Sequence, residues 1–143
     1  MNTFLLAWNP KRWPWGNLES MRQKIDDGVE IDRLWSCRSG KVEIGDRIFI
    51  IRLGEEPKGI FASGYVTEKT EGQHWDESKN ELIPYVRVKF DKLINPDIEG
   101  VKMLFMEELQ SKDFQPMHWS TQMSGVRIRD VVADHLEEVW KQY

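Results

Sequence analysis

Tryptophans and cations are concentrated near the N-terminus, in the segment AWNPKRWPW from residue 7 to residue 15. This segment contains three of the seven tryptophans of the chain, together with Lys11 and Arg12. An indole face stacks on a flat ring, and a neighbouring lysine or arginine neutralises a phosphate. The segment therefore indicates either a core region beside a basic turn or the wall of a site for a flat, anionic ligand.

Five of the tryptophans stand beside Pro, Gly, Ser, His or a charged residue, at expected loop positions or strand ends. Each one alone is also explained as a packing residue that buries its ring and hydrogen-bonds its indole N–H. Five together favour a site that holds a base, because stacking contributes about 1 to 3 kcal/mol per base. Trp8 and Trp140 lie on apolar patterns and are expected in the core. The five are Trp13, Trp15, Trp35, Trp75 and Trp119.

Signatures of enzymes are sparse. The motifs GxxxxGK[ST], GxGxxG, HExxH and GxSxG are all missing from the sequence. His74, with Asp76 and Glu77, has the composition of an acid-base or metal site, although such clusters are common in ordinary loops. Cys37 is the single cysteine, which excludes an internal disulfide and any CxxC-type metal or redox site. We therefore expect a protein that is not an enzyme and uses no cofactor and no metal.

Length and composition predict one domain over residues 1–143, because 143 residues with a 40% hydrophobic fraction suffice for a single core. No apolar run approaches the roughly 20 residues that span a bilayer, and no signal-peptide pattern opens the chain. A cytoplasmic protein without a membrane partner is expected. The net charge of -4 normally argues against a nucleic-acid partner. The acids gather in the C-terminal third, however, which leaves room for a basic face elsewhere.

Apolar periodicity predicts an α+β fold, a small curled sheet or open barrel with helices at its edges. Asn17 and Asp130 are expected to cap helices, Gly28 to end one, and Gly64 to mark a bulge or a close backbone approach. The polar residues 68–81 are expected to form a loop. Strands are predicted at residues 3–8, 31–38, 48–53, 59–67 and 85–90, with a short strand in 117–128, and helices at 18–27, 101–109 and 130–143.

Six blocks carry a resemblance to a known family: TFLLAWNPKRWPW, RLWSCRSGKVEIGDRIFIIRLGEEPKGIFASGYV, HWD, YVRVKFDKLI, MSGVRI and LEEVW. Together, in this order, they cover nearly the whole chain and resemble the EVE domain, in the form found at the N-terminus of EVE-HNH modification-dependent restriction endonucleases. The resemblance implies a PUA-like fold, an open mixed β-barrel of about five to six strands with flanking helices. It also implies kinship with YTH and ASCH domains and an activity of reading a modified base.

The same resemblance implies a base-binding pocket. YTH readers hold a methylated base in a cage formed partly by a Trp-Ser pair at the end of a strand and by a tryptophan from a later loop. Trp35 and Ser36 resemble that pair, and Trp75 resembles the loop partner. Asn9 and Trp13 are similar in placement to the residues that complete the pocket wall.

The resulting hypothesis is a domain that binds duplex DNA containing 5-methylcytosine or 5-hydroxymethylcytosine by flipping the base out, at a cost of a few kcal/mol. Trp35 and Trp75 would sandwich the base, while Ser36 and Asn9 would bond its polar edge. A single methyl group adds only about 1 to 3 kcal/mol of discrimination. We therefore expect modest selectivity, to which a restriction enzyme adds by requiring a second site.

Phosphate contacts are expected beside this pocket. Lys11 and Arg12 would meet phosphates, and the two prolines would hold their loop rigid. Ser124 and Gly125 would bring backbone N–H groups to the nucleic acid, or else form a plain tight turn. The other predicted phosphate-binding residues are Arg38, Lys41, Arg127 and Arg129, each equally well explained as a solvated surface charge.

Three other functions remain open from the sequence. The same cage suits methylated RNA, as in YTH domains, for which single strands are expected. It also suits a free modified nucleotide. A protein-interaction module would instead lack nucleotide affinity and expose an apolar patch. The HNH nuclease of the restriction enzymes has no counterpart in these residues, so we expect a specificity module or free-standing reader, with any nuclease supplied in cis or in trans.

Overall fold

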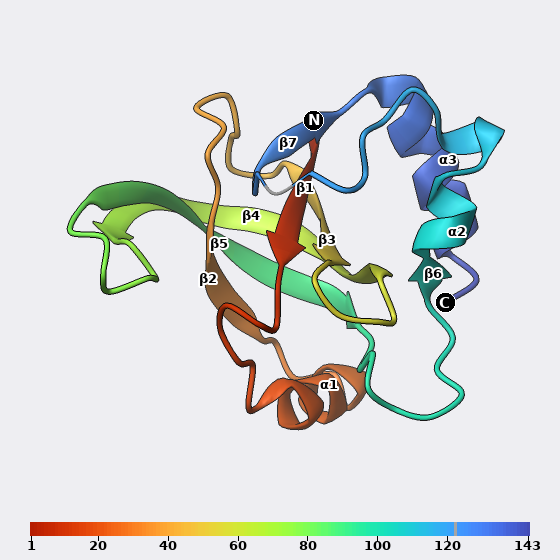
Figure 1. Cartoon of the computed structure of the whole chain (residues 1–143), viewed down its shortest axis with the longest axis horizontal. Coiled ribbons are helices and arrows are strands. Elements are labelled where there is room, and N and C mark those ends of the chain that lie inside the picture. Colours follow the sequence, from red (N-terminus) through yellow and green to blue (C-terminus); the bar gives the residue numbers. More distant parts are fainter. Residues whose placement is uncertain (122) are drawn as a thin grey trace.

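The computed structural model describes residues 1–121 and 123–143 as a mostly antiparallel sheet with flanking helices (Figure 1). In these residues seven strands form one sheet, accompanied by three α-helices and one short 3-10 helix. The strands are β1 (Thr3–Trp8), β2 (Asp32–Ser36), β3 (Arg47–Arg52), β4 (Gly59–Gln73), β5 (Leu82–Leu93), β6 (Leu104–Phe105) and β7 (Val126–Ile128). The helices are α1 (Leu18–Asp26), α2 (Met106–Leu109), the 3-10 helix η1 (Lys112–Phe114) and α3 (Asp130–Trp140).

The sheet has the strand order β2-β5-β4-β3-β1-β7, with β6 paired to β4 outside this path. β1 and β3 run parallel, and the other pairs are antiparallel. The α+β class and the flanking helices are as predicted. The short strand expected in residues 117–128 is confirmed as β7. The seventh strand, β6, was not predicted, because two residues are too few to show a period in the sequence.

The two outer strands of the path approach each other through the segments next to them. The backbone N–H of Arg38, just after β2, donates to the carbonyl oxygen of Ser124, just before β7, at 2.8 Å. The Ser124 hydroxyl donates to the carbonyl oxygen of Ser36 at 2.7 Å, and Trp35 Nε1 donates to the Ala7 carbonyl oxygen at 3.1 Å. Within the described residues no strand pairing joins β2 to β7. The sheet is therefore strongly curved but open, and its two edges meet at one seam.

The core consists of two apolar clusters, because the side chains of each buried strand alternate between two faces. Phe4, Leu6 and Trp8 of β1 belong to one cluster, and Leu5 to the other. α1 adds to the first cluster and α3 to the second, so the two helices cover different faces of the sheet (Figure 1). Trp8 and Trp140 are buried, at 4% and 2% exposure, which confirms their predicted core positions.

The longest departure from the predicted elements is the β4–β5 hairpin. Residues 68–73, predicted as loop, continue β4 and pair with residues 82–87 of β5. Most of their side chains are exposed, so the segment has no apolar alternation by which a sequence reading detects a strand. The predicted bulge at Gly64 is confirmed by a register shift between Ser63 and Gly64. A Cβ atom on Gly64 would lie 2.4 Å from the carbonyl oxygen of Lys89, so the two backbones approach closely.

The helix predicted at residues 101–109 is wrong for most of its length. Leu104 and Phe105 form β6 against Gly59 and Ile60 of β4, and only Met106–Leu109 is helical. The pairing partner lies more than forty residues away along the chain, so a local pattern does not reveal it.

The predicted capping residues of α1 and α3 are confirmed only in part. Gly28 ends α1 as predicted, with a φ of 84° and a hydrogen bond from its N–H to the Ile25 carbonyl oxygen at 3.0 Å. Asn17 makes no side-chain capping bond. Arg129, not Asp130, occupies the N-cap backbone position of α3, and Asp130 lies in the first turn, where a carboxylate favours the helix dipole.

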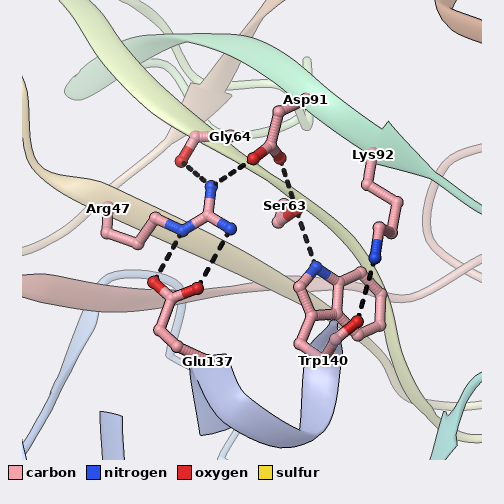
Figure 2. A network of polar contacts seen from close by, with 7 residues as sticks. All are labelled: Arg47, Ser63, Gly64, Asp91, Lys92, Glu137 and Trp140. Atoms are coloured by element: carbon pink, nitrogen blue, oxygen red, sulfur yellow. Dashed lines mark hydrogen bonds and ion pairs between the residues drawn. The ribbon is translucent and has the colours of Figure 1, made fainter. Parts of the chain in front are cut away.

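A polar network fixes α3 to the sheet (Figure 2). The buried Arg47 donates from Nε to Glu137 Oε2 and from Nη1 to Asp91 Oδ2, each at 2.8 Å. Burial alone would lower the pKa of Arg47, but its bond to Glu137 and the charge of Asp91 outweigh this effect and raise the pKa. Trp140 Nε1 donates to Ser63 Oγ at 2.9 Å, and the Ser63 hydroxyl donates to Asp91. The C-terminal helix is therefore held by paired charges and by a buried indole.

Candidate functional site

The N-terminal segment AWNPKRWPW forms a compact aromatic turn after β1. The Asn9 carbonyl oxygen accepts the backbone N–H of Arg12 at 3.0 Å, and Trp8 Nε1 donates to the Trp13 carbonyl oxygen at 3.1 Å. The ring centroid of Trp8 lies 5.8 Å from that of Trp13 and 5.7 Å from that of Trp15. The segment combines the two roles left open by the sequence, because Trp15 is buried in the core and Trp13 is half-buried at the surface.

A cavity of about 610 Å³ opens at the seam where the sheet edges meet. Its volume is within the range of about 300 to 1,000 Å³ typical of sites for small ligands. Five separate segments contribute to it: the turn after β1, the end of β2, the β3–β4 loop, the β4–β5 hairpin loop and the segment before β7. The lining residues are Ala7, Trp8, Asn9, Arg12, Trp13, Ser36, Arg38, Leu53, Gly54, Lys58, His74, Trp75, Lys79, Ser120, Met123 and Ser124.

A smaller cavity of about 280 Å³ adjoins the first. The two share Trp13, Ser36 and Trp75 as lining residues. The remaining walls of the smaller cavity are Pro14, Arg33, Leu34, Trp35 and Tyr85. The surface therefore offers two neighbouring subsites divided by shared aromatic side chains.

The structure brings together the five predicted base-binding residues around these two cavities. Asn9, Trp13, Ser36 and Trp75 line the larger cavity, and Trp35 lines the smaller one. Trp75 is 37% exposed, whereas Trp35 is only 3% exposed. The sandwich of a base between Trp35 and Trp75 stays a prediction. In the ligand-free fold the Trp35 ring already packs against Trp13 and Trp15, at centroid distances of 5.0 and 5.3 Å.

Two other tryptophans grouped with them by the sequence are core residues. Trp15 is 6% exposed and Trp119 is 3% exposed. Trp119 packs edge-on against Phe114, at a centroid distance of 6.1 Å, in the cluster covered by α3. Their loop positions suggested exposure, but both loops fold back onto the sheet and bury these rings.

The predicted phosphate-binding cations divide into two groups. Arg12 and Arg38 line the larger cavity, while Lys11, Lys41, Arg127 and Arg129 line neither cavity. Arg127 Nη2 instead lies 3.3 Å from Asp130 Oδ1.

Lys58 and Lys79 also line the larger cavity, and no sequence pattern singled them out. The described lining of this cavity includes no Asp or Glu. Arg38 Nη2 lies 3.9 Å from Glu81 Oε1, a carboxylate outside the lining. The four lining cations still give the cavity an excess of positive charge, which favours an anionic ligand despite the acidic net charge.

The amide group of Asn9 is held in one orientation. Its Oδ1 accepts the backbone N–H of Lys11 at 3.0 Å, which identifies the oxygen, and its Nδ2 has no acceptor among the described residues. Gly54 has a φ of 85°, and a Cβ on it would lie 2.2 Å from Asn9 Oδ1. Asn9 therefore packs over the bare Cα of Gly54 and is left with an N–H donor for a ligand.

Replacing Gly54 with alanine is expected to displace Asn9 and to weaken ligand binding by about tenfold, the effect of one lost hydrogen bond to a polar ligand edge. Gly45→Ala is the matched control, because Gly45 has a similar φ of 94° but nothing within 4 Å of the added Cβ. Both variants should lose about 1 to 2 kcal/mol of stability from the left-handed backbone. Thermal unfolding and a binding titration check the pair, and equal affinities of the two variants would contradict the role of Asn9.

His74 stabilises the hairpin loop that carries Trp75. The residue is 5% exposed, its Nδ1 accepts the backbone N–H of Asp76 at 2.9 Å, and its ring centroid lies 4.9 Å from that of Trp75. The ring proton therefore resides on Nε2. Among the described residues no group of three His, Cys, Asp or Glu side chains is placed to hold a metal ion. Cys37 is buried, and burial raises the pKa of its thiol.

Ser124 and Gly125 build the seam itself. Ser124 lines the larger cavity, and the N–H of Gly125 donates to the Leu5 carbonyl oxygen at 2.9 Å. A Cβ on Gly125 would lie 2.7 Å from the backbone nitrogen of Arg38. Gly125 therefore lies close to the segment that follows β2. Its N–H is already bonded within the protein, so it is not the donor to a nucleic acid that the sequence suggested.

Comparisons with known proteins show the fold alone. No family model matches the sequence, and no curated protein matches it. A hypothetical protein from Leishmania major has a similar structure, with a TM-score of 0.66 and 14% identity, covering 99% of this chain and 96% of the other. The crystal structure of a protein from Pseudomonas syringae is similar with a TM-score of 0.62 and 13% identity, covering 96% and 98%. Among the described residues no helix is long and apolar enough to cross a bilayer.

Proposed function

We propose that this domain has a PUA-like fold and reads a modified base in DNA, with 5-methylcytosine or 5-hydroxymethylcytosine flipped out of the duplex into the larger cavity. It would serve as the specificity module of a modification-dependent restriction system whose nuclease acts in cis or in trans. The observation that carries this proposal is the composition of the cavity, which combines tryptophan walls with four cations and no described carboxylate.

The cavity has the groups that offset the cost of flipping. Extruding a base costs a few kcal/mol, and stacking on an aromatic side chain returns about 1 to 3 kcal/mol per base. Trp13 and Trp75 are the lining tryptophans that reach the surface, whereas Trp8 is buried. Arg12, Arg38, Lys58 and Lys79 would contact the phosphates on both sides of the flipped nucleotide.

The polar edge of the base would be read by Asn9 and Ser36. Asn9 Nδ2 and the Ser36 hydroxyl both lack hydrogen-bond partners among the described residues, and both residues line the cavity. Asn9 supplies a donor for a ring or carbonyl acceptor of the base, and a hydroxyl adapts as donor or acceptor. The resemblance to EVE and YTH domains identifies the same two residues, which supports a base rather than another flat anion as the ligand.

The test is a fluorescence-anisotropy titration of short duplexes that each carry one central base: 5-methylcytosine, 5-hydroxymethylcytosine, N6-methyladenine or unmodified cytosine. A single-stranded RNA with one N6-methyladenine is the fifth probe. We expect one modified-cytosine duplex to bind about 5- to 100-fold more tightly than the unmodified one, with affinity falling as salt rises. Equal, weak and salt-dependent binding of all probes would overturn the proposal, and so would a preference for the RNA.

A further inference from the structure

Arg33 is a half-buried cation whose guanidinium lies over three indole rings. Its guanidinium carbon lies 4.8 Å from the ring centroid of Trp15, 5.0 Å from that of Trp13 and 5.8 Å from that of Trp35. It also lines the smaller cavity. Burial lowers the pKa of this guanidinium, and no neighbouring charge acts on it in the opposite direction. The aromatic faces hold the cation in place without neutralising it.

No carboxylate accepts a hydrogen bond from Arg33 within the described residues. The acids beside it in the sequence are already paired with cations of β5. Asp32 accepts from Arg87 Nη1 at 3.0 Å, and Glu30 accepts from Lys89 Nζ at 2.8 Å. The five N–H donors of Arg33 therefore have no acceptor among the described residues.

The two fully buried arginines of the described chain are neutralised, unlike the half-buried Arg33. Arg47 contacts Asp91 and Glu137, and Arg52, at 2% exposure, contacts Asp97 at 2.8 Å. Removing a guanidinium from water without a counter-ion is costly. An unpaired arginine at the wall of a cavity therefore indicates that a bound ligand supplies the anion. A phosphate matches the guanidinium fork through two parallel hydrogen bonds.

We propose that the smaller cavity is a second subsite, in which Arg33 binds a backbone phosphate of the nucleic acid whose base occupies the larger cavity. This inference rests on the proposed function, because the two cavities share Trp13, Ser36 and Trp75 and a ligand in one reaches the other. The sugar of that nucleotide would lie on the apolar wall of Leu34 and Tyr85. Arg33 is then a binding residue that neither the charge pattern nor the resemblance identified.

The test measures the salt dependence of binding for wild type, Arg33→Gln and Arg33→Lys, on the modified and the unmodified duplex. Arg33→Gln should weaken binding to both duplexes about tenfold and reduce the slope of log affinity against log salt by about 1, with the ratio between duplexes unchanged. Arg33→Lys should retain the slope. Arg87→Gln is the matched control, since Arg87 lies on the neighbouring strand β5 and is paired with Asp32 and Glu68.

The outcomes separate this inference from the proposed function. A wild-type protein without preference for any modified duplex overturns the proposed function, yet the slope on the unmodified duplex still reports whether Arg33 binds a phosphate. An unchanged slope in Arg33→Gln overturns the inference, as does an equal loss of slope in Arg87→Gln. If Arg33→Gln lost the preference for the modified duplex but kept the salt slope, Arg33 would act by positioning the tryptophans. That result would also overturn the inference. Thermal unfolding of each variant establishes that it is folded.

Discussion

Replacing Trp75 with alanine is expected to lower the affinity for the preferred modified duplex by about 5- to 100-fold, the loss of one stacked base. Trp75 lines both cavities and is 37% exposed, so a ligand reaches its ring and its removal leaves the core intact. Trp35 is less suited to this test, because at 3% exposure its replacement also removes core packing. Anisotropy titrations of the modified and unmodified duplexes measure the effect, which should be larger for the modified one.

Leu82→Ala is the control for Trp75→Ala. Leu82 is 62% exposed and begins β5 at the other end of the same hairpin loop, but it lines neither cavity. Its replacement should leave both affinities unchanged. Retention of the full preference for the modified duplex in Trp75→Ala would show that the base is held elsewhere.

Replacing Trp140 with alanine is expected to reduce the free energy of unfolding by about 3 to 5 kcal/mol, the usual cost of truncating a buried tryptophan. Trp140 is 2% exposed and packs against Phe49 at a centroid distance of 5.9 Å. Its indole also donates to Ser63, whose hydroxyl would lose this partner inside the network of Figure 2. Urea denaturation followed by circular dichroism gives the free energy of unfolding directly.

Val131→Ala on the same helix is the matched control. Val131 is 82% exposed, so its truncation removes no buried surface, and alanine is the better helix former. The expected change is within about 0.5 kcal/mol of wild type. A similar small change in Trp140→Ala would contradict the assignment of α3 as the cover of the second cluster.

Local patterns in the sequence determined the fold class and most of its central elements. The apolar run at residues 3–8 and the β-branched run at residues 48–53 correspond to β1 and β3, which are almost wholly buried. The spacing of Leu18 and Met21 and the glycine at position 28 identified α1 and its end. These predictions succeeded because the apolar pattern of each segment is visible within a few consecutive residues.

Strands that depend on pairing between distant segments were not predictable from local patterns. The end of β4 at residues 68–73 is a strand because it bonds to residues 82–87 of β5, although it has no buried side chain of its own. Leu104 and Phe105 are extended because β4 supplies their partner. In both places tertiary hydrogen bonds override local preference, and no residue spacing reports them.

For the site, the sequence by itself determined which residue types are present, and the resemblance selected Asn9, Trp13, Ser36 and Trp75, which do meet at one cavity. Only the tertiary structure decided which cations lie there. Lys58 belongs to the cavity and Lys41 does not, because the curvature of the sheet brings the β3–β4 loop to the seam. The same packing places Arg33 against three indole rings and assigns its neighbouring acids to other cations. A charge shows its sign in the sequence, but its partner and its exposure depend on segments that meet only after folding.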